Sequence, residues 1–203
     1  MTAIEFWYEF ASTYSYPAAM RAGEAAKEKG VAVQWRPFLL GPVFAELGWT
    51  TSPFNLQPAK GAYMWRDLER TCQRLDLPFR RPDPFPQHSV AAARIATALT
   101  DDGADGARAR FSRAVYRAEF GDGLAISDQN VLAGLLEAES LDPFTVTAQA
   151  NAPETKQALR ASTDEARALG IFGAPTFRTP DGELFWGNDR LDEATDWVLE
   201  HVA

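Results

Sequence analysis

The sequence predicts an α/β protein whose strands lie near the two ends of the chain and whose middle is helical. Near the amino terminus, a strand-like run, an alanine-rich stretch and a second strand-like run follow one another within residues 1–40. Near the carboxyl terminus, two short strand-like runs joined by a turn precede a last amphipathic stretch. The chain has 203 residues, of which 46% are hydrophobic, so it can bury a full core without metal or disulfide support.

The first strand is expected over residues 4–10, where apolar and polar residues alternate with the two-residue period of a strand. Trp7 is the exception, since it is an apolar residue on the opposite face. The alanine-rich stretch that follows ends at Gly30 and predicts a helix, and the run VAVQWRPFLL predicts a second strand. Such a unit favours a parallel, right-handed crossover, and α/β sheets commonly bind ligands at the loop after the first strand.

The middle of the chain predicts helices. They are expected at residues 63–75, 89–99, 107–120, 128–138 and 153–169. Proline-rich stretches around residues 53–58 and 78–86 predict loops between them. We therefore assign residues 41–169 to an all-helical insertion, and residues 1–40 and 170–203 to the domain that contains the sheet.

The end of the chain predicts strands at residues 174–178 and 183–186, with a Pro-Asp-Gly turn between them and a last helix after them. This order of elements is that of a thioredoxin-like fold with an all-helical domain inserted in its middle. Proteins of this fold keep a cis proline that faces the active-site loop. Pro175, at the entry to a strand, occupies that position.

Composition argues against several classes of partner. The formal net charge of -8 and the lack of basic runs disfavour nucleic acid. The amino terminus lacks the basic residues and apolar core of a secretory signal, and no apolar run approaches the ~18 residues of a membrane span. His88 and His201 have no cluster of cysteines or carboxylates around them, so no metal site is predicted. We expect a cytoplasmic protein.

The segment Ser12-Thr13-Tyr14-Ser15 stands where a thioredoxin-type redox enzyme carries Cys-x-x-Cys, and Cys72 is the single cysteine of the chain. Because a dithiol cycle needs two sulfurs within bonding reach, any sulfur chemistry must use a thiol from outside, for which glutathione is the candidate. Ser12 is expected at the start of the first helix. There its hydroxyl and the free N–H groups of the helix can favour a bound thiolate, and the same position would suit an N-cap.

The chain contains four notable motifs, in the order YEFASTYSYP, KGAYMWRDLER, GIFGAPTF and FWGNDRL. Together they resemble the motifs of the 2-hydroxychromene-2-carboxylate isomerases and of their relatives, the kappa-class glutathione transferases of the DsbA-like group. The resemblance covers nearly the whole chain, and FGAPTF and FWGNDRL are its most specific parts. It implies a homodimeric enzyme that depends on glutathione. In the isomerases the substrate is a small bicyclic aromatic intermediate of naphthalene-type degradation.

The resemblance assigns Ser12 to the glutathione sulfur, as the catalytic residue. Thr13 and Tyr14 are expected beside it in the same site. Thr13 departs from the family, whose members commonly have proline after this serine, and the change removes the fixed φ of the first turn.

Three further residues are expected to bind glutathione. The backbone of Ala174 would pair with the peptide-like part of the ligand, as an added strand does. The resemblance gives Asn188 and Asp189 the γ-glutamyl end, with Asp189 meeting the ammonium group. Asp189 can also serve as the cap of the last helix.

We therefore hypothesise a glutathione-dependent isomerase in which the thiolate adds to the substrate, the ring opens, a bond that has become single rotates, and glutathione is expelled. One alternative is a kappa-like transferase that releases the adduct of another electrophile. The other is a thioredoxin-fold module that binds a peptide or partner and catalyses nothing. Ser12, Pro175 and Asn188 at consistent positions argue against this last alternative, although fold does not guarantee activity.

Overall fold

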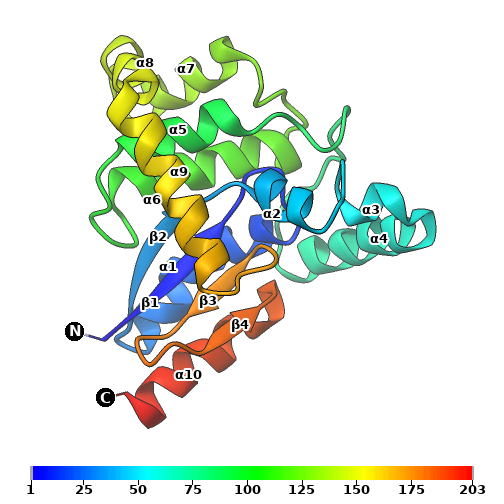
Figure 1. The fold of residues 1–203 in the computed structure, drawn as a ribbon, viewed down its shortest axis with the longest axis vertical. Helices are drawn as coiled ribbons and strands as arrows, with labels where there is room; N and C mark the ends of the chain where they lie inside the picture. Colours follow the sequence, from blue (N-terminus) through cyan, green and yellow to red (C-terminus); the bar gives the residue numbers. More distant parts are fainter. Residues whose placement is uncertain (1, 203) are drawn as a thin grey trace.

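The computed structural model describes residues 2–202 and is built on a four-stranded mixed sheet (Figure 1). The strands are β1 (Ala3–Tyr8), β2 (Ala32–Pro37), β3 (Thr176–Arg178) and β4 (Leu184–Trp186), in the spatial order β2-β1-β3-β4. β1 pairs in parallel with β2 and antiparallel with β3, and β3 pairs antiparallel with β4. The predicted parallel crossover at the amino terminus and the predicted hairpin at the carboxyl terminus are both confirmed.

Helix α1 (Ser15–Glu28) joins β1 to β2, and α10 (Leu191–His201) follows β4 after a 3-10 turn, η2 (Asn188–Arg190). The segments between β2 and β3 are α2 (Leu40–Glu46), α3 (Pro53–Leu56), α4 (Pro58–Arg74), α5 (Val90–Ala98), α6 (Ala107–Tyr116), the π-helix η1 (Arg117–Gly121), α7 (Gln129–Ala138), α8 (Pro143–Asn151) and α9 (Pro153–Ala168). Figure 1 shows α5–α9 gathered at one end of the sheet and α3 and α4 at its side. Among residues 2–202, no helix combines the length and apolarity that crossing a membrane requires.

Several predicted boundaries are wrong. The first strand ends at Tyr8 rather than at residue 10, because the chain turns sharply there, and the second ends at Pro37, after which α2 begins. The predicted loop at residues 53–58 holds α3 and the start of α4. Pro53 and Pro58 lie in the first turn of these helices, where the missing N–H costs nothing. Helix α8 also begins with a proline and was missed for the same reason.

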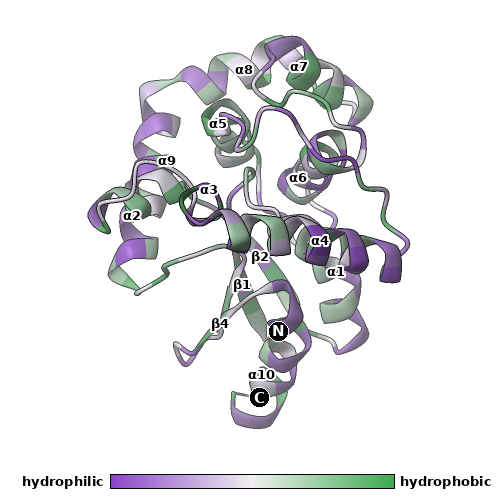
Figure 2. Ribbon diagram, turned by 90° about the vertical axis from the view of Figure 1, so that its right-hand side faces the viewer, coloured by the Kyte–Doolittle hydropathy of each residue, from purple (hydrophilic) through white to green (hydrophobic). Residues whose placement is uncertain are grey.

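The core is continuous between the sheet and the inserted helices. Phe6 and Tyr8 of β1 and Phe111 and Leu136 of the inserted helices are buried in one cluster. Trp7 points to the other face of the sheet, as predicted, and packs in a smaller cluster with Phe38, Ala166 and Ile171, the last just beyond α9. In Figure 2, stretches of hydrophilic residues colour the ribbons of α4 and α9. The division of the chain into two domains near residues 40 and 170 remains a prediction.

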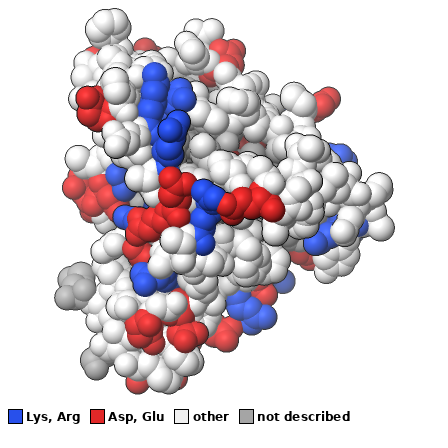
Figure 3. Space-filling model, in the orientation of Figure 1, with Lys and Arg blue, Asp and Glu red and all other residues white. Residues whose placement is uncertain are grey.

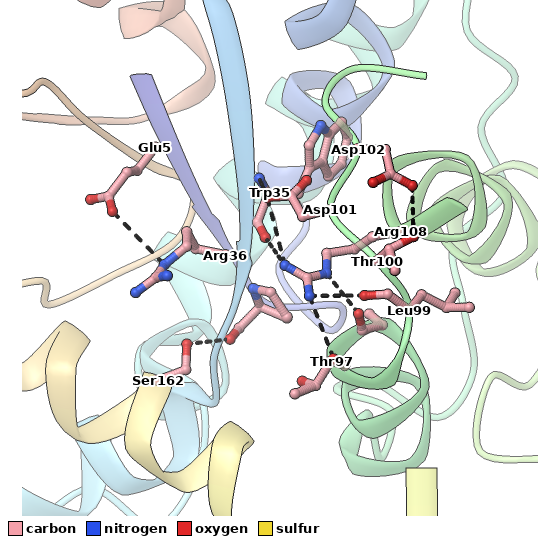
Figure 4. A network of polar contacts seen from close by, with 12 residues as sticks. Glu5, Trp35, Arg36, Thr97, Leu99, Thr100, Asp101, Asp102, Arg108 and Ser162 are labelled. Atoms are coloured by element: carbon pink, nitrogen blue, oxygen red, sulfur yellow. Dashed lines mark hydrogen bonds and ion pairs between the residues drawn. The ribbon is translucent and has the colours of Figure 1, made fainter. Parts of the chain in front are cut away.

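Arg108 of α6 ties the edge strand β2 to the inserted helices (Figure 4). Its guanidinium donates to the carbonyl of Trp35 at 3.0 Å and to the carbonyls of Ala96 and Leu99 at 2.8 and 2.9 Å. Asp101 lies 3.6 Å from this guanidinium and accepts the Trp35 backbone N–H at 3.0 Å. The edge of β2 is thereby bonded by side chains instead of by another strand.

Helix α9 is fastened to the end of β2. The Ser162 hydroxyl donates to the Pro37 carbonyl at 2.8 Å, and Thr163 Oγ1 accepts the Leu39 backbone N–H at 3.2 Å. Nearby, Arg36 pairs with Glu165, one of several ion pairs of the surface around α9, where Figure 3 shows cationic and anionic side chains side by side. These contacts place the chain that leaves β2 beside the site described below.

Glu119 in the π-helix η1 is fully buried, and within the described residues neither of its carboxyl oxygens has a hydrogen-bond partner. Burial, and then the carboxyl group of Glu9, raise the pKa of Glu119 well above its usual range. The folded protein therefore keeps a proton on this side chain at pH values where a free glutamic acid side chain begins to lose it.

We predict that Arg108→Met lowers the free energy of unfolding by about 3 kcal/mol, because it leaves buried carbonyl groups and Asp101 without their partner. Urea unfolding measures the change. Arg66→Met is the control, since Arg66 forms an exposed ion pair with Glu69 and should cost under about 1 kcal/mol. Equal losses in the two variants would contradict the role of Arg108.

We predict that Glu119→Gln makes stability less dependent on pH. The raised pKa means that the folded state keeps a proton that the unfolded state releases above pH 4.5, the ordinary pKa of this group. Wild-type stability should therefore fall by about 1.4 kcal/mol per pH unit from this group alone until its folded pKa is reached. Urea unfolding at about pH 5 and about pH 8 measures the free energy of unfolding of both proteins. The value for the variant, relative to that of the wild type, should be higher at about pH 8 than at about pH 5. The same change with pH in both proteins would contradict the assignment.

Candidate active site

Ser12 and Ala174 meet where the first strand ends and the third begins. β1 and β3 run antiparallel, with Phe6 opposite Phe177, so the loop after β1 lies beside the loop before β3. The Ser12 hydroxyl donates to the Ala174 carbonyl at 2.8 Å across 162 positions of sequence. The Ala174–Pro175 peptide bond is cis, as predicted. The proline loop therefore faces the loop that carries Ser12.

Ser12 precedes α1 rather than starting it, so this prediction is corrected. Its N–H donates to the Glu9 carbonyl at 3.0 Å and its carbonyl accepts from Ser15 N–H at 3.1 Å, which makes a tight turn before the helix. The capping position is held by Tyr14, with no side-chain cap, so Ser12 does not serve as the N-cap. The N–H group of Ser15, one of those expected to be free for a bound thiolate, is therefore hydrogen bonded within this turn. The helix dipole at the start of α1 still favours an anion there.

Tyr14 joins this loop to α4. Its hydroxyl donates to Asp67 Oδ2 at 3.0 Å, and burial followed by the nearby Asp67 charge raises the pKa of Tyr14. Asp67 also accepts from Arg70 at 3.1 Å. Thr13 is buried, with 2% of its surface exposed. Of these two predicted residues, Tyr14 has a side chain that reaches an open cavity.

This cavity, which we call the β4 cavity, has a volume of about 590 Å³ and lies between α4 and the end of β4. It is lined by Tyr14, Tyr63, Asp67, Thr71, Arg74, Ala174, Pro175, Trp186, Gly187, Asn188, Asp189 and Arg190. The α4 residues are spaced three or four apart and so share one face of that helix. The predicted residues Tyr14, Ala174, Asn188 and Asp189 thus come together around one space, and Ser12 reaches it through Ala174.

Asn188 and Asp189 lie in η2, at the edge of the β4 cavity. Asn188 is 7% exposed, and its Oδ1 atom has no hydrogen-bond partner within the described residues. Asp189 is exposed and lies 3.9 Å from Arg190. The interpretation of Asp189 as a cap is wrong, because Arg190 holds the capping position of α10 and no side chain caps it. Gly187 has φ +123°, and a Cβ there would meet Asp189 Oδ1 at 2.5 Å.

The charges around the β4 cavity are balanced. Asp67 and Asp189 supply anionic groups, and Arg74 and Arg190 supply cationic ones. The unpartnered carbonyl oxygen of Asn188 adds a buried acceptor, which costs free energy unless a donor reaches it. This arrangement suits a zwitterionic ligand that carries an ammonium group and carboxylates.

A second cavity, which we call the Glu9 cavity, has a volume of about 440 Å³. It is lined by Glu9, Ala11, Leu39, Leu40, Gly41, Pro42, Phe44, Trp49, Thr50, Thr51, Ser52, Pro86, Gln87, His88, Ser89 and Val90. Ser12 adjoins a lining residue of each cavity: its chain neighbour Ala11 lines the Glu9 cavity, and Ala174, which accepts its hydrogen bond, lines the β4 cavity. The side-chain amide of Asn55, just beyond this lining, donates to Thr51 at 3.2 Å.

Glu9 is a residue of this site that the sequence did not reveal, because it occupies a polar position of the expected strand. It is 6% exposed, and its carboxyl group accepts hydrogen bonds from the Ser89 hydroxyl and the Ala11 N–H. Burial raises the pKa of Glu9 from 4.5 to about 7, against the lowering effect of these two bonds. The one available signal was its place three residues before Ser12.

Cys72 is buried in α4, with 1% of its surface exposed. Burial raises the pKa of its thiol to about 11, so this thiol is held in the unreactive protonated form at neutral pH. Within residues 2–202, no three His, Cys, Asp or Glu side chains converge as metal ligands would. The site therefore consists of hydroxyl, amide, carboxyl and guanidinium groups.

Known proteins resemble this chain over almost its whole length. The family model described as a DSBA-like thioredoxin domain matches residues 3–197. A 2-hydroxychromene-2-carboxylate isomerase from Sphingobium xenophagum is 30% identical, over 97% of this chain and 98% of the relative. Glutathione S-transferase kappa 2 from Caenorhabditis elegans is 26% identical, over 97% of this chain and 92% of the relative.

A solved structure of a 2-hydroxychromene-2-carboxylate isomerase superposes with a TM-score of 0.86 at 22% sequence identity, covering 98% of this chain and 95% of the other. This superposition shows the shared fold, and the predicted thioredoxin-like fold of the DsbA type is confirmed. The chain therefore belongs to the DSBA-like thioredoxin family, in the company of the 2-hydroxychromene-2-carboxylate isomerases and the kappa-class glutathione transferases.

Proposed function

We propose that this protein is a glutathione-dependent isomerase of the 2-hydroxychromene-2-carboxylate type. The observation that carries the proposal is the position of Ser12 next to lining residues of two cavities, one polar and balanced in charge, the other largely apolar. A thiol bound in the first could reach a substrate in the second. The relative with 30% identity and full-length coverage carries the name of this activity.

Glutathione would occupy the β4 cavity. Its sulfur lies at Ser12, whose hydroxyl turns from the Ala174 carbonyl to the thiolate. The ammonium group of its γ-glutamyl end donates to the buried Oδ1 of Asn188, with Asp189 as the second, anionic partner. The Ala174 backbone then pairs with the peptide part of the ligand, as an added strand does. Arg190 and Arg74 stand where the carboxylates of the ligand need cationic partners.

The aromatic substrate would occupy the Glu9 cavity, against Phe44 and Trp49. The thiolate adds to an electrophilic carbon of the substrate, the ring opens, and rotation follows about a bond that has become single. Expulsion of glutathione leaves the isomeric open-chain product, so glutathione acts as a cofactor. Thiolate is the reactive form, and a hydroxyl donor at the start of a helix lowers the pKa of a thiol.

A kappa-like transferase is the second candidate, favoured by the transferase from Caenorhabditis elegans that aligns over 97% of this chain. Both reactions begin with the same addition, and they differ in whether glutathione is regenerated. Incubation with glutathione and a 2-hydroxychromene-2-carboxylate separates them. Isomer formation with constant glutathione supports the isomerase, whereas loss of glutathione into an adduct supports the transferase. The non-catalytic module is the remaining alternative. We also propose a cytoplasmic homodimer, on the family resemblance.

We predict that Ser12→Ala lowers thiolate formation and the rate of isomerisation by roughly 10- to 100-fold, because one hydrogen bond to a charged sulfur is lost. The ultraviolet difference spectrum of bound glutathione at roughly 240 nm reports the thiolate. Ser15→Ala is the matched control, since Ser15 lies in the same turn and is fully buried. Unchanged thiolate absorbance in Ser12→Ala would overturn the role of Ser12.

We predict that Asn188→Leu weakens glutathione binding roughly 10-fold or more, because the variant keeps the side-chain volume and loses the buried acceptor. Calorimetric titration measures the Kd. A glutathione analogue without the γ-glutamyl ammonium group should bind the wild type and the variant alike, since it has no donor for Oδ1. If the variant weakens both ligands equally, the contact assigned to Asn188 is incorrect.

A further inference from the structure

The Glu9 cavity holds a buried carboxyl group for which the proposed glutathione site has no use. Glu9 lies just after β1, and the Ser12 N–H donates to its backbone carbonyl at 3.0 Å. The Tyr116 hydroxyl donates to the same carbonyl at 2.9 Å. The backbone at Glu9 is thus held from two sides, and its carboxyl group is held in the wall of the cavity.

The groups that face this carboxyl come from each element around it. Ser89, before α5, donates its hydroxyl, and Ala11 donates its backbone N–H. Glu119 of η1 is the nearby buried acid, and Tyr116 of α6 is a buried phenol whose pKa burial raises well above the ordinary value. His88 lines the same cavity and is exposed. The partners of the Glu9 carboxyl are therefore neutral donors and a neutral acid, which leave the group free to exchange a proton.

We propose that Glu9 is the acid–base residue for the substrate in the Glu9 cavity. The inference rests on the proposed function and names the group that moves the proton. Carbon 2 of a 2-hydroxychromene-2-carboxylate bears a hydroxyl, a carboxylate and the ring oxygen, and is therefore a hemiketal carbon. Opening such a ring requires removal of the hydroxyl proton and its delivery to the departing ring oxygen.

Ring opening begins at the hydroxyl of carbon 2. The Glu9 carboxylate takes the proton of this hydroxyl, and the electron pair of the O–H bond forms the C=O bond at carbon 2. The bond between carbon 2 and the ring oxygen breaks, and its pair remains on the oxygen as a phenolate. The protonated Glu9 then returns the proton to this oxygen. No proton is gained or lost overall in this ring opening, which follows addition of the glutathione thiolate and precedes its expulsion.

Ser12 and Glu9 face different cavities and would act on different molecules, Ser12 on the glutathione sulfur and Glu9 on the substrate. Ser12 directs its hydroxyl toward Ala174 and the β4 cavity, whereas Glu9 lines the other cavity. A carboxyl group with a pKa near 7 can both accept and donate a proton near neutral pH, and efficient acid–base groups have a pKa near the working pH. Glu119, a buried residue of η1, is not among the residues that line either cavity, and burial raises its pKa well above the usual range.

The test compares Glu9→Gln with the matched variant Glu119→Gln, at saturating glutathione, across pH. In the wild type, kcat for ring opening should rise with pH and level off above about 7, since the carboxylate form is required. Glu9→Gln should lose roughly 100-fold or more in kcat and lose this dependence, while the thiolate absorbance of bound glutathione stays unchanged. Glu119→Gln should keep both the rate and the pH profile.

The variant Ser89→Ala provides a second test, because a purely structural role of Glu9 predicts no change in the pH dependence of kcat. The Ser89 hydrogen bond lowers the pKa of Glu9, so its removal should shift the rise in kcat to higher pH, with circular dichroism reporting an intact fold. Full activity in Glu9→Gln, or an unshifted profile in Ser89→Ala, would overturn the assignment of Glu9. A wild-type protein that binds glutathione as thiolate and does not open the chromene ring would instead overturn the proposed function, and this inference with it.

Discussion

Strand β1 is the element on which the rest of the molecule depends. It is hydrogen bonded on both sides, to β2 in parallel and to β3 in antiparallel register, and its side chains are buried on both faces of the sheet. The end of this strand carries Glu9 and leads into the turn of Ser12. The antiparallel partner brings the Ala174–Pro175 loop to the same place. One pairing therefore assembles residues from the two ends of the chain into a single site.

The helices inserted between β2 and β3 complete this site from outside the sheet. Helix α4 supplies one wall of the β4 cavity, and the segments before α5 and around α2 supply most of the Glu9 cavity. Arg108 bonds backbone carbonyls of β2 and α5, and Ser162 of α9 bonds the last carbonyl of β2. Helix α5, which follows one wall of the Glu9 cavity, is thereby connected to the same strand that pairs with β1.

The region behind Ser12 contains two buried carboxyl groups, an arrangement that lowers stability at neutral pH because burial disfavours their charged forms. A hydrophobic core of the same shape would avoid this cost. The two groups differ in their surroundings: Glu9 lines a cavity and has two donors, whereas among residues 2–202 Glu119 has no hydrogen-bond donor and is not a lining residue of either cavity. Burial of an ionisable group beside a cleft is a common mark of a functional site, and Glu9 meets this description.

Sequence patterns alone predict the fold class, the strand–helix–strand start, the facing proline and four of the residues that line the β4 cavity, which are Tyr14, Ala174, Asn188 and Asp189. These features depend on local periodicity and on motifs whose neighbours lie close in sequence. The sequence did not determine that the proline-rich stretch at residues 53–58 is helical, because proline in a first helical turn and proline in a loop look alike. It also predicts Ser12 at the start of the first helix, although a turn delays the start of α1 to Ser15.

Only the tertiary structure decided which polar residues are buried. Glu9 alternates with apolar residues as an exposed strand residue would, yet Ser89, Tyr116 and Glu119, all distant in sequence, enclose it. The unpartnered oxygen of Asn188 is likewise a product of packing. Burial and the pKa of an ionisable side chain depend on atoms brought together from remote parts of the chain, and a one-dimensional pattern does not contain those distances.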